Sequence, residues 1–214
     1  MLGVIAFVVF GYLGLQQTVG LVVTAIVLMS LTCQTLVFGG RNSIANSAIT
    51  LFGSVYVGLP MAAALMLRYT GGEQAGFGYL LLAILTVWAT DTGAYYGGRA
   101  FGKRKLAPRV SPNKTWEGAV IGLACGVVTG IILRWLGASL MWWPHLGVSH
   151  SITLAVITSI SGQMGDLAES TFKRSAEVKD SGNFMPGHGG VLDRLDSLLL
   201  AIPVVYYYVK LFLS

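Results

Sequence analysis

Six uncharged, mostly apolar stretches recur along the chain, and short polar segments separate them. They cover residues 18–38, 48–67, 77–90, 119–133, 152–165 and 197–209. A helix needs roughly 20 mostly apolar residues to cross a bilayer, so several stretches reach that length only if a charged residue at one end joins the helix. The pattern predicts six membrane helices. A shorter apolar segment at 1–15 predicts one more, because it lacks the basic start of a signal peptide.

The composition indicates that lipid is the solvent of this protein. Of its 214 residues, 54% are hydrophobic and 11% are charged, and the mean hydropathy is +0.70. A soluble domain carries about 25% charged residues, so this chain has too few charges to cover a water-soluble globule. The sequence therefore predicts an all-α fold, a polytopic bundle of transmembrane helices.

The basic residues indicate how these helices are oriented. Eleven of the 14 Lys and Arg residues fall in three segments, 39–46, 97–116 and 171–195, and two predicted helices separate each segment from the next. All three segments are therefore expected on one side of the membrane. The side rich in Lys and Arg is normally the cytoplasmic one, which makes this the predicted cytoplasmic face.

An acidic residue ends the fifth apolar stretch. Asp166 follows 152–165 with no basic residue before Lys173. A charged side chain within a membrane helix costs about 2.5–3.5 kcal/mol, and Glu169 and Ser170 share the same helical face. Carboxylates so placed repel one another unless a cation lies between them, so Asp166 is a candidate metal ligand.

Three further carboxylates lie at predicted helix ends. Asp193 and Asp196 begin the last helix, and Asp91 follows the stretch 77–90. Hard oxygen ligands of this kind suit magnesium or manganese. Two simpler explanations stay open: Asp193 and Asp196 would also be stabilised by a helix N-terminus, and Asp91 could pair with a basic residue of the neighbouring loop.

A basic, glycine-rich segment follows Asp166. Glycines let backbone N–H groups approach an anion closely, and cations beside carboxylates are typical of sites that bind metal and polyphosphate. Two residues also have ordinary explanations, because Lys173 and Arg174 fit simple anchoring at the cytoplasmic face, and His188 could only shape a turn. The segment contains Lys173, Arg174, Lys179, Asp180, Gly182, Pro186, Gly187, His188, Gly189 and Gly190.

The segment 97–116 has the glycine and lysine spacing of a P-loop but lacks its other features. Gly97 to Lys103 has the required spacing, but Arg104 stands where Ser or Thr would bind magnesium. No strand is expected before it. What remains is a basic loop suited to phosphates or anionic headgroups.

Two stretches resemble the phosphatidate cytidylyltransferase (CDP-diacylglycerol synthase) family. The first runs from Ser170 to Asp196 and reads STFKR, then KDSG, then PGHGGVLDRLD, with Met185 where the family pattern has Leu, Ile or Phe. The second runs from Asp91 to Gly118 and includes DTGAY, FGK and SPNKT. The resemblance covers the chain from Asp91 onward, and the N-terminal third is similar only in being helical membrane.

The resemblance implies an enzyme that converts CTP and phosphatidate into CDP-diacylglycerol and pyrophosphate, with Mg²⁺ as one or two bound cations. It implies N-terminal membrane helices at 1–78 and a catalytic membrane domain at 79–214, with cytoplasmic loops 97–116 and 171–192. A polar cavity would open to the cytoplasm from the inner membrane. The partners implied are CTP, phosphatidate and the bilayer. We expect no nucleic acid partner, and homo-oligomer formation stays open.

The residue pattern and the resemblance together predict roles for individual residues. The expected metal ligands are Asp166, Asp193, Asp196 and Asp91. The expected catalytic residues are Lys173, Arg174, Asp166, Asp193 and His188. The expected substrate-binding residues are Ser170, Lys179, Asp180, Gly189, Gly190, Arg194, Arg99, Lys103, Ser111, Asn113 and Lys114.

Three other functions compete with this interpretation. A lipid-alcohol kinase would share the metal and phosphate chemistry but would release CDP instead of pyrophosphate. An ion-coupled transporter also carries intramembrane acids, but it would be expected to contain inverted repeats and broken helices, which the sequence does not suggest. A purely structural membrane subunit would need neither the acids nor the basic glycine-rich segment.

Overall fold

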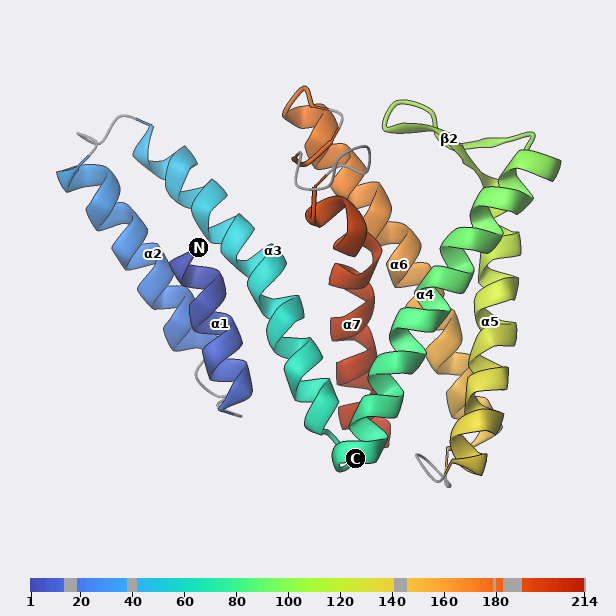
Figure 1. Ribbon diagram of the computed structural model, residues 1–214. Helices are drawn as coiled ribbons and strands as arrows, with labels where there is room; N and C mark the ends of the chain where they lie inside the picture. The colour runs from blue at the N-terminus through green and yellow to red at the C-terminus, as the bar shows by residue number, and fades with distance from the viewer. Residues whose placement is uncertain (14–18, 38–41, 141–145, 179, 183–189, 214) are drawn as a thin grey trace. The chain divides into compact units, whose positions relative to one another are not determined.

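The computed structural model describes residues 1–13, 19–37, 42–140, 146–178, 180–182 and 190–213. Within them the chain is almost entirely helical (Figure 1), which confirms the predicted all-α class. Two short strands form the only sheet in this described part, β1 (Lys105–Ala107) and β2 (Ser111–Thr115). The helices are α1 (Leu2–Tyr12), α2 (Val19–Leu36), α3 (Ser43–Tyr69), α4 (Glu73–Phe101), α5 (Trp116–Ser139), α6 (Val148–Ser175) and α7 (Leu192–Phe212).

Five of these helices are long and apolar enough to cross a membrane, namely α2, α3, α4, α5 and α7. The shorter apolar helix α1 corresponds to the predicted segment 1–15. The 28-residue α6 contains the predicted stretch 152–165, but its serines, threonines and acids make it the most polar of the long helices. The protein is thus a multi-pass membrane protein, as its composition predicted.

The helices extend further into the charged segments than the apolar stretches alone indicated. The predicted loop 97–116 begins later, because α4 continues through Arg99 to Phe101. Gly97 permits this extension: a Cβ there would meet the side chain of Ile121 at 2.7 Å, so the missing side chain lets α4 and α5 pack closely. The predicted loop 171–192 is likewise shortened, since α6 continues to Ser175.

A β-hairpin that the sequence pattern did not predict connects α4 to α5. Lys105 pairs with Thr115, and Ala107 pairs with Ser111, in antiparallel register. The turn between the strands contains Pro108, whose fixed φ favours turn positions. Thr115 ends β2 and caps α5, because its Oγ1 accepts a hydrogen bond from the Gly118 N–H at 3.2 Å.

The chain forms two compact units, Met1–Met66 and Leu67–Ser214. In the first, α1, α2 and most of α3 pack around a small core that contains Phe7, Val22, Ile26 and Ala62. Whether the boundary of the catalytic part lies at 78/79, as the sequence suggested, stays a prediction.

The second unit consists of α4, α5, α6, α7 and the hairpin. Its helices are joined by polar contacts as well as by apolar packing, because Thr90 of α4 donates a hydrogen bond to Ser159 of α6 at 2.8 Å. Figure 1 shows the hairpin at the same end of this bundle as the C-terminal end of α6 and the start of α7. The described parts of both predicted basic segments of this unit therefore lie at one end, as the count of helices required.

Candidate active site

A polar cavity of about 700 Å³ lies where α4, the hairpin, the start of α5 and the middle of α6 meet. Its walls combine carboxylates with cations and small residues, and an opening of this size and polarity suits a charged small molecule. The residues that line it are Asp91, Ala94, Tyr95, Gly98, Arg99, Gly102, Lys105, Leu106, Ser111, Asn113, Lys114, Thr115, Ala119, Gln163 and Asp166.

The helix α4 supplies one wall through residues that recur at helical spacing. Asp91, Tyr95, Gly98 and Gly102 lie three or four positions apart, so they share one face. The apolar pattern had suggested that Asp91 lies at the end of a helix, but the structure places it within α4, ten residues before the end of the helix at Phe101. The polar face of a membrane helix thus points at the cavity.

An ion pair connects the hairpin to α6 across the cavity. The Nζ of Lys114 on β2 lies 2.7 Å from Oδ2 of Asp166, and the two side chains are 25% and 32% exposed. The hydroxyl of Ser170, one turn further along α6, donates to the other oxygen of Asp166 at 3.4 Å. Lys114 is therefore the present counter-ion of the intramembrane acid that the sequence singled out.

Three carboxylates are close enough to interact electrostatically. Asp91 and Asp196 both lie within electrostatic reach of Asp166 and of Lys114. In the described part of the chain, no three His, Cys, Asp or Glu side chains form a ready-made metal cage. Mg²⁺ is usually bound by one or two carboxylates, with waters and substrate phosphates completing its shell, so Asp91 of α4 and Asp166 of α6, which both line the cavity, fit this cation.

A second charged network lies at the junction of α6 and α7. The Nζ of Lys173 makes ion pairs with Glu169, one turn earlier on α6, and with Oδ1 of Asp193, at 2.8 Å. The other oxygen of Asp193 accepts hydrogen bonds from the N–H of Ser181 at 2.9 Å, its hydroxyl at 2.7 Å and the N–H of Gly190 at 2.7 Å. Asp193 is in the first turn of α7, as predicted, but its present partners are all protein donors.

The predicted site residues therefore separate into groups. The cavity brings together Asp91, Arg99, Ser111, Asn113, Lys114 and Asp166. Lys173, Asp193 and Gly190 form the second network, and Asp196 lies near the cavity carboxylates. Lys179, His188 and Gly189 fall outside the described residues.

Four predicted residues lie away from the cavity wall. The backbone N–H of Lys103 donates to Glu117 at 3.0 Å, and the Nε of Arg174 donates to the carbonyl of Val110 at 3.3 Å. Arg174 therefore connects α6 to the hairpin turn. The remaining two, Asp180 and Arg194, are exposed.

The cavity also includes residues that the sequence analysis did not select, among them Tyr95, Lys105 and Gln163. Helical spacing could have identified two of them, since Tyr95 lies one turn after Asp91 and Gln163 one turn before Asp166. Lys105 gave no such signal, because its position depends on the unexpected hairpin. Glu169 was noticed for its spacing from Asp166, but its importance lies in its contact with Lys173.

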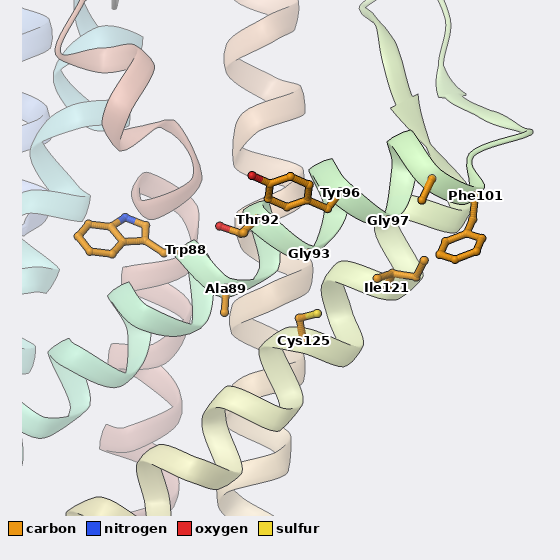
Figure 2. A pocket seen from close by; sticks show the side chains of 10 residues that line it. Trp88, Ala89, Thr92, Gly93, Tyr96, Gly97, Phe101, Ile121 and Cys125 are labelled. Carbon is orange, nitrogen blue, oxygen red and sulfur yellow. The ribbon is translucent and has the colours of Figure 1, made fainter.

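The opposite face of α4 carries an apolar groove of about 690 Å³. Figure 2 shows Trp88, Tyr96 and Phe101 along α4, with Ile121 and Cys125 contributed by α5. All three aromatic side chains are more than half exposed. The helix thus separates a polar cavity from a surface suited to lipid chains.

Comparisons with known proteins agree with the motifs. The model of the cytidylyltransferase family matches residues 1–212. Three curated relatives carry the name phosphatidate cytidylyltransferase. The Haemophilus influenzae protein is 46% identical over 151 residues, which is 69% of this chain and 52% of that protein. The Staphylococcus haemolyticus protein is 40% identical over 88% of this chain and 68% of its own length. The Bacillus subtilis protein is 40% identical over 77% and 58%.

These alignments also show how much of each relative's length the chain covers. It spans about half of the Haemophilus relative and about two thirds of the Staphylococcus relative. The family match nevertheless extends over nearly every residue, including both stretches that carry the cavity and the second network. This chain belongs to the cytidylyltransferase family.

Proposed function

We propose that this protein transfers the cytidylyl group of CTP to phosphatidate, giving CDP-diacylglycerol and pyrophosphate for phospholipid synthesis. The observation that carries the proposal is the cavity, whose walls include the acids Asp91 and Asp166 and the cations Arg99, Lys105 and Lys114. Its acidic part suits a divalent cation, and its basic part suits phosphate groups. The names of the relatives point to the same reaction.

The reaction needs no side-chain nucleophile, because the phosphate of phosphatidate is itself an anion. One of its oxygens attacks the α-phosphorus of CTP, a new P–O bond forms, and the bond to the bridging oxygen breaks. The electron pair leaves with pyrophosphate. The main obstacle is repulsion between two anions, so cationic side chains fixed in the cavity wall, Arg99, Lys105 and Lys114, would stabilise the charge that develops.

Magnesium is part of this proposal. Asp91 and Asp166 would hold it, with Asp196 nearby. A bound divalent cation would neutralise phosphate oxygens and orient the two substrates. The roles predicted for Asp193 as a metal ligand and for His188 as a proton donor or hydrogen-bond donor stay predictions.

The lipid substrate accounts for a polar site inside a membrane protein. Phosphatidate can remain in the bilayer while its headgroup enters the cavity, and the apolar groove on the other face of α4 fits a helix surrounded by acyl chains (Figure 2). The basic hairpin borders the cavity. We therefore place the active site at the cytoplasmic face of the inner membrane, and homo-oligomer formation remains an open part of the proposal.

Product analysis tests this function directly. The full chain in detergent micelles is given CTP, phosphatidate and Mg²⁺, and pyrophosphate, CDP and the lipid product are measured. We expect pyrophosphate release that depends on both phosphatidate and the cation. Asp166→Asn should reduce it by on the order of 100-fold or more, whereas Glu73→Gln, an exposed acid at the start of α4, should leave it unchanged.

Each alternative predicts a different result. Release of CDP in place of pyrophosphate would identify a kinase. Absence of any CTP-dependent product, from folded protein supplied with both substrates, would overturn the transferase proposal and favour transport. If Asp166→Asn were as active as the parent protein, the proposed reaction would still hold, but the cavity would not be its active site.

A further inference from the structure

The ammonium group of Lys173 is the centre of the network at the junction of α6 and α7. We propose that Lys173 is a positioning residue. Glu169 holds the ammonium group of Lys173, and this group in turn holds the carboxylate of Asp193. Asp193 hydrogen-bonds to both Ser181 and Gly190, the described ends of the connection before α7, and we call this arrangement the fastening of the two ends. The consequence for catalysis rests on the proposed function, but the fastening itself does not.

Glu169 holds Lys173 from the side of the helix bundle. Its side chain is 1% exposed, and both of its carboxylate oxygens are buried. A buried carboxylate is costly unless a cation compensates its charge. Lys173, one turn further along α6, supplies that charge through its ion pair. The position of the ammonium group is therefore determined from within the fold.

Asp193 holds the connection from the other side. Its two oxygens accept from Lys173 Nζ, the Ser181 hydroxyl and two backbone N–H groups, all within 2.9 Å. A carboxylate offers about four acceptor sites, so these four donors satisfy it. The carboxylate of Asp193 is thus engaged as a fastening point between α6, α7 and the chain that joins them.

The two fastened residues also lie against each other. A Cβ built on Gly190 would lie 2.9 Å from the backbone N of Gly182 and 3.0 Å from the carbonyl carbon of Ser181. Any side chain at position 190 would therefore force the ends apart. Because Gly190 has no side chain, it can lie against Ser181 and Gly182, and the hydrogen bonds to Asp193 stabilise this contact.

This arrangement changes the role expected of Lys173. With its side chain 20% exposed and two carboxylates against its ammonium group, it compensates negative charge of the protein. The connection that it fastens begins and ends beside residues predicted to bind substrate. Fixing the ends beforehand reduces the entropy lost when a ligand binds, so loss of Lys173 should weaken CTP binding more than it slows chemistry.

Hydrogen exchange measures the fastening without any substrate. The full chain is labelled in detergent, and peptides that contain the Ser181 and Gly190 amides are followed, because both amides donate to Asp193. Lys173→Met and Asp193→Asn should each speed exchange of these amides about tenfold or more. Lys173→Arg should stay close to the parent. The control Glu177→Gln changes an exposed acid just after α6 and should have no effect.

A double variant separates fastening from folding. Lys173→Met alone leaves Glu169 buried without a cation, which can unfold the protein. Glu169→Gln with Lys173→Met removes both charges and should restore thermal stability, while the Ser181 and Gly190 amides still exchange fast. If Lys173→Met does not fold, the exchange rates of the Ser181 and Gly190 amides in Asp193→Asn and in the double variant test the proposal instead.

Kinetics then distinguish positioning from direct catalysis. In the folded variants lacking Lys173, we expect the KM for CTP to rise about tenfold and kcat to change by less than about threefold. Unchanged exchange together with a large fall in kcat would overturn the proposal, because Lys173 would then act on the substrate. A third outcome is that the variants exchange these amides fast while the parent protein releases no pyrophosphate. That result would support the fastening and reject the proposed function.

Discussion

At the residue scale, one of the cations that line the cavity makes an ion pair with one of its acids. Lys114 comes from the hairpin, and its partner Asp166 comes from α6. Asp91 and Asp196 lie within electrostatic reach of this pair. A substrate phosphate that enters the cavity would therefore meet Lys114 beside Asp166, and we predict that Lys114 binds phosphate while it also compensates the charge of Asp166.

Replacing Lys114 tests this double role. Lys114→Met should lower kcat/KM for pyrophosphate release by on the order of 100-fold, since a cationic donor that faces developing phosphate charge is lost. Lys114→Arg keeps the charge and should lose less. Lys210→Met, which removes a lysine near the C-terminal end of α7, is the matched control. Activity of Lys114→Met within about threefold of the parent would contradict a role for Lys114 at the phosphates.

The residues of this site were partly predictable. Intramembrane cost and spacing identified Asp166, the position at the end of an apolar stretch identified Asp91, and the family motif added Lys114. The partner of each charge was not predictable, because Lys114 and Asp166 are brought together by the packing of the hairpin against α6. Similarly, the motif identified Lys173 and Asp193 as important, whereas only the structure places Lys173 between two carboxylates.

At the element scale, the cavity depends on how closely α4 and α5 approach each other. Gly118, Gly122 and Gly126 recur at every fourth position of α5 and are buried against α4 or α6. Small residues at this spacing let membrane helices approach closely. A Cβ on Gly118 would lie 2.6 Å from the carbonyl oxygen of Ala94, and one on Gly122 would lie 2.6 Å from that of Thr90.

Alanine at these positions should therefore push the two helices apart. We expect Gly118→Ala and Gly122→Ala each to destabilise the protein by about 1–3 kcal/mol, as overpacking does, which would lower the thermal unfolding midpoint in detergent. Gly53→Ala in α3 is the control, because nothing lies within 4 Å of its Cβ. Midpoints of all three variants equal to that of the parent would show that the helices tolerate a wider separation.

The helices themselves were predictable from apolar runs, but their ends were not. Runs of uncharged residues located the centres of all six long helices. The end of α4 lies beyond Gly97 and Gly98, a pair that reads as a loop signal in sequence and here serves helix packing. The hairpin was missed for a related reason, since Lys105–Ala107 and Ser111–Thr115 are too short and too polar to show a strand pattern.

At the scale of the whole molecule, charge is distributed unevenly along the chain. The few basic residues outside the basic segments have local explanations. Arg68 donates to the carbonyl of Glu73 at 2.6 Å, Arg134 to that of Leu146 at 2.9 Å, and Lys210 to the hydroxyl of Tyr206 at 3.4 Å. Most of the basic residues lie instead in the hairpin and around the α6–α7 connection, and the excess of Lys and Arg there predicts that this end of the bundle is cytoplasmic.

This orientation can be measured with single cysteines in membrane vesicles. Arg109→Cys in the hairpin turn and Glu177→Cys after α6 should both react with an impermeant maleimide in inverted vesicles and be protected in right-side-out vesicles. Glu73→Cys, at the other end of α4, should show the opposite pattern, since a 29-residue helix separates it from the hairpin. The unmodified chain, with Cys33 and Cys125, gives the background. Labelling of Arg109→Cys and Glu177→Cys from opposite sides would refute the shared face. Labelling of both from outside would place the cavity away from the cytoplasm, where a site that consumes CTP has no supply of it.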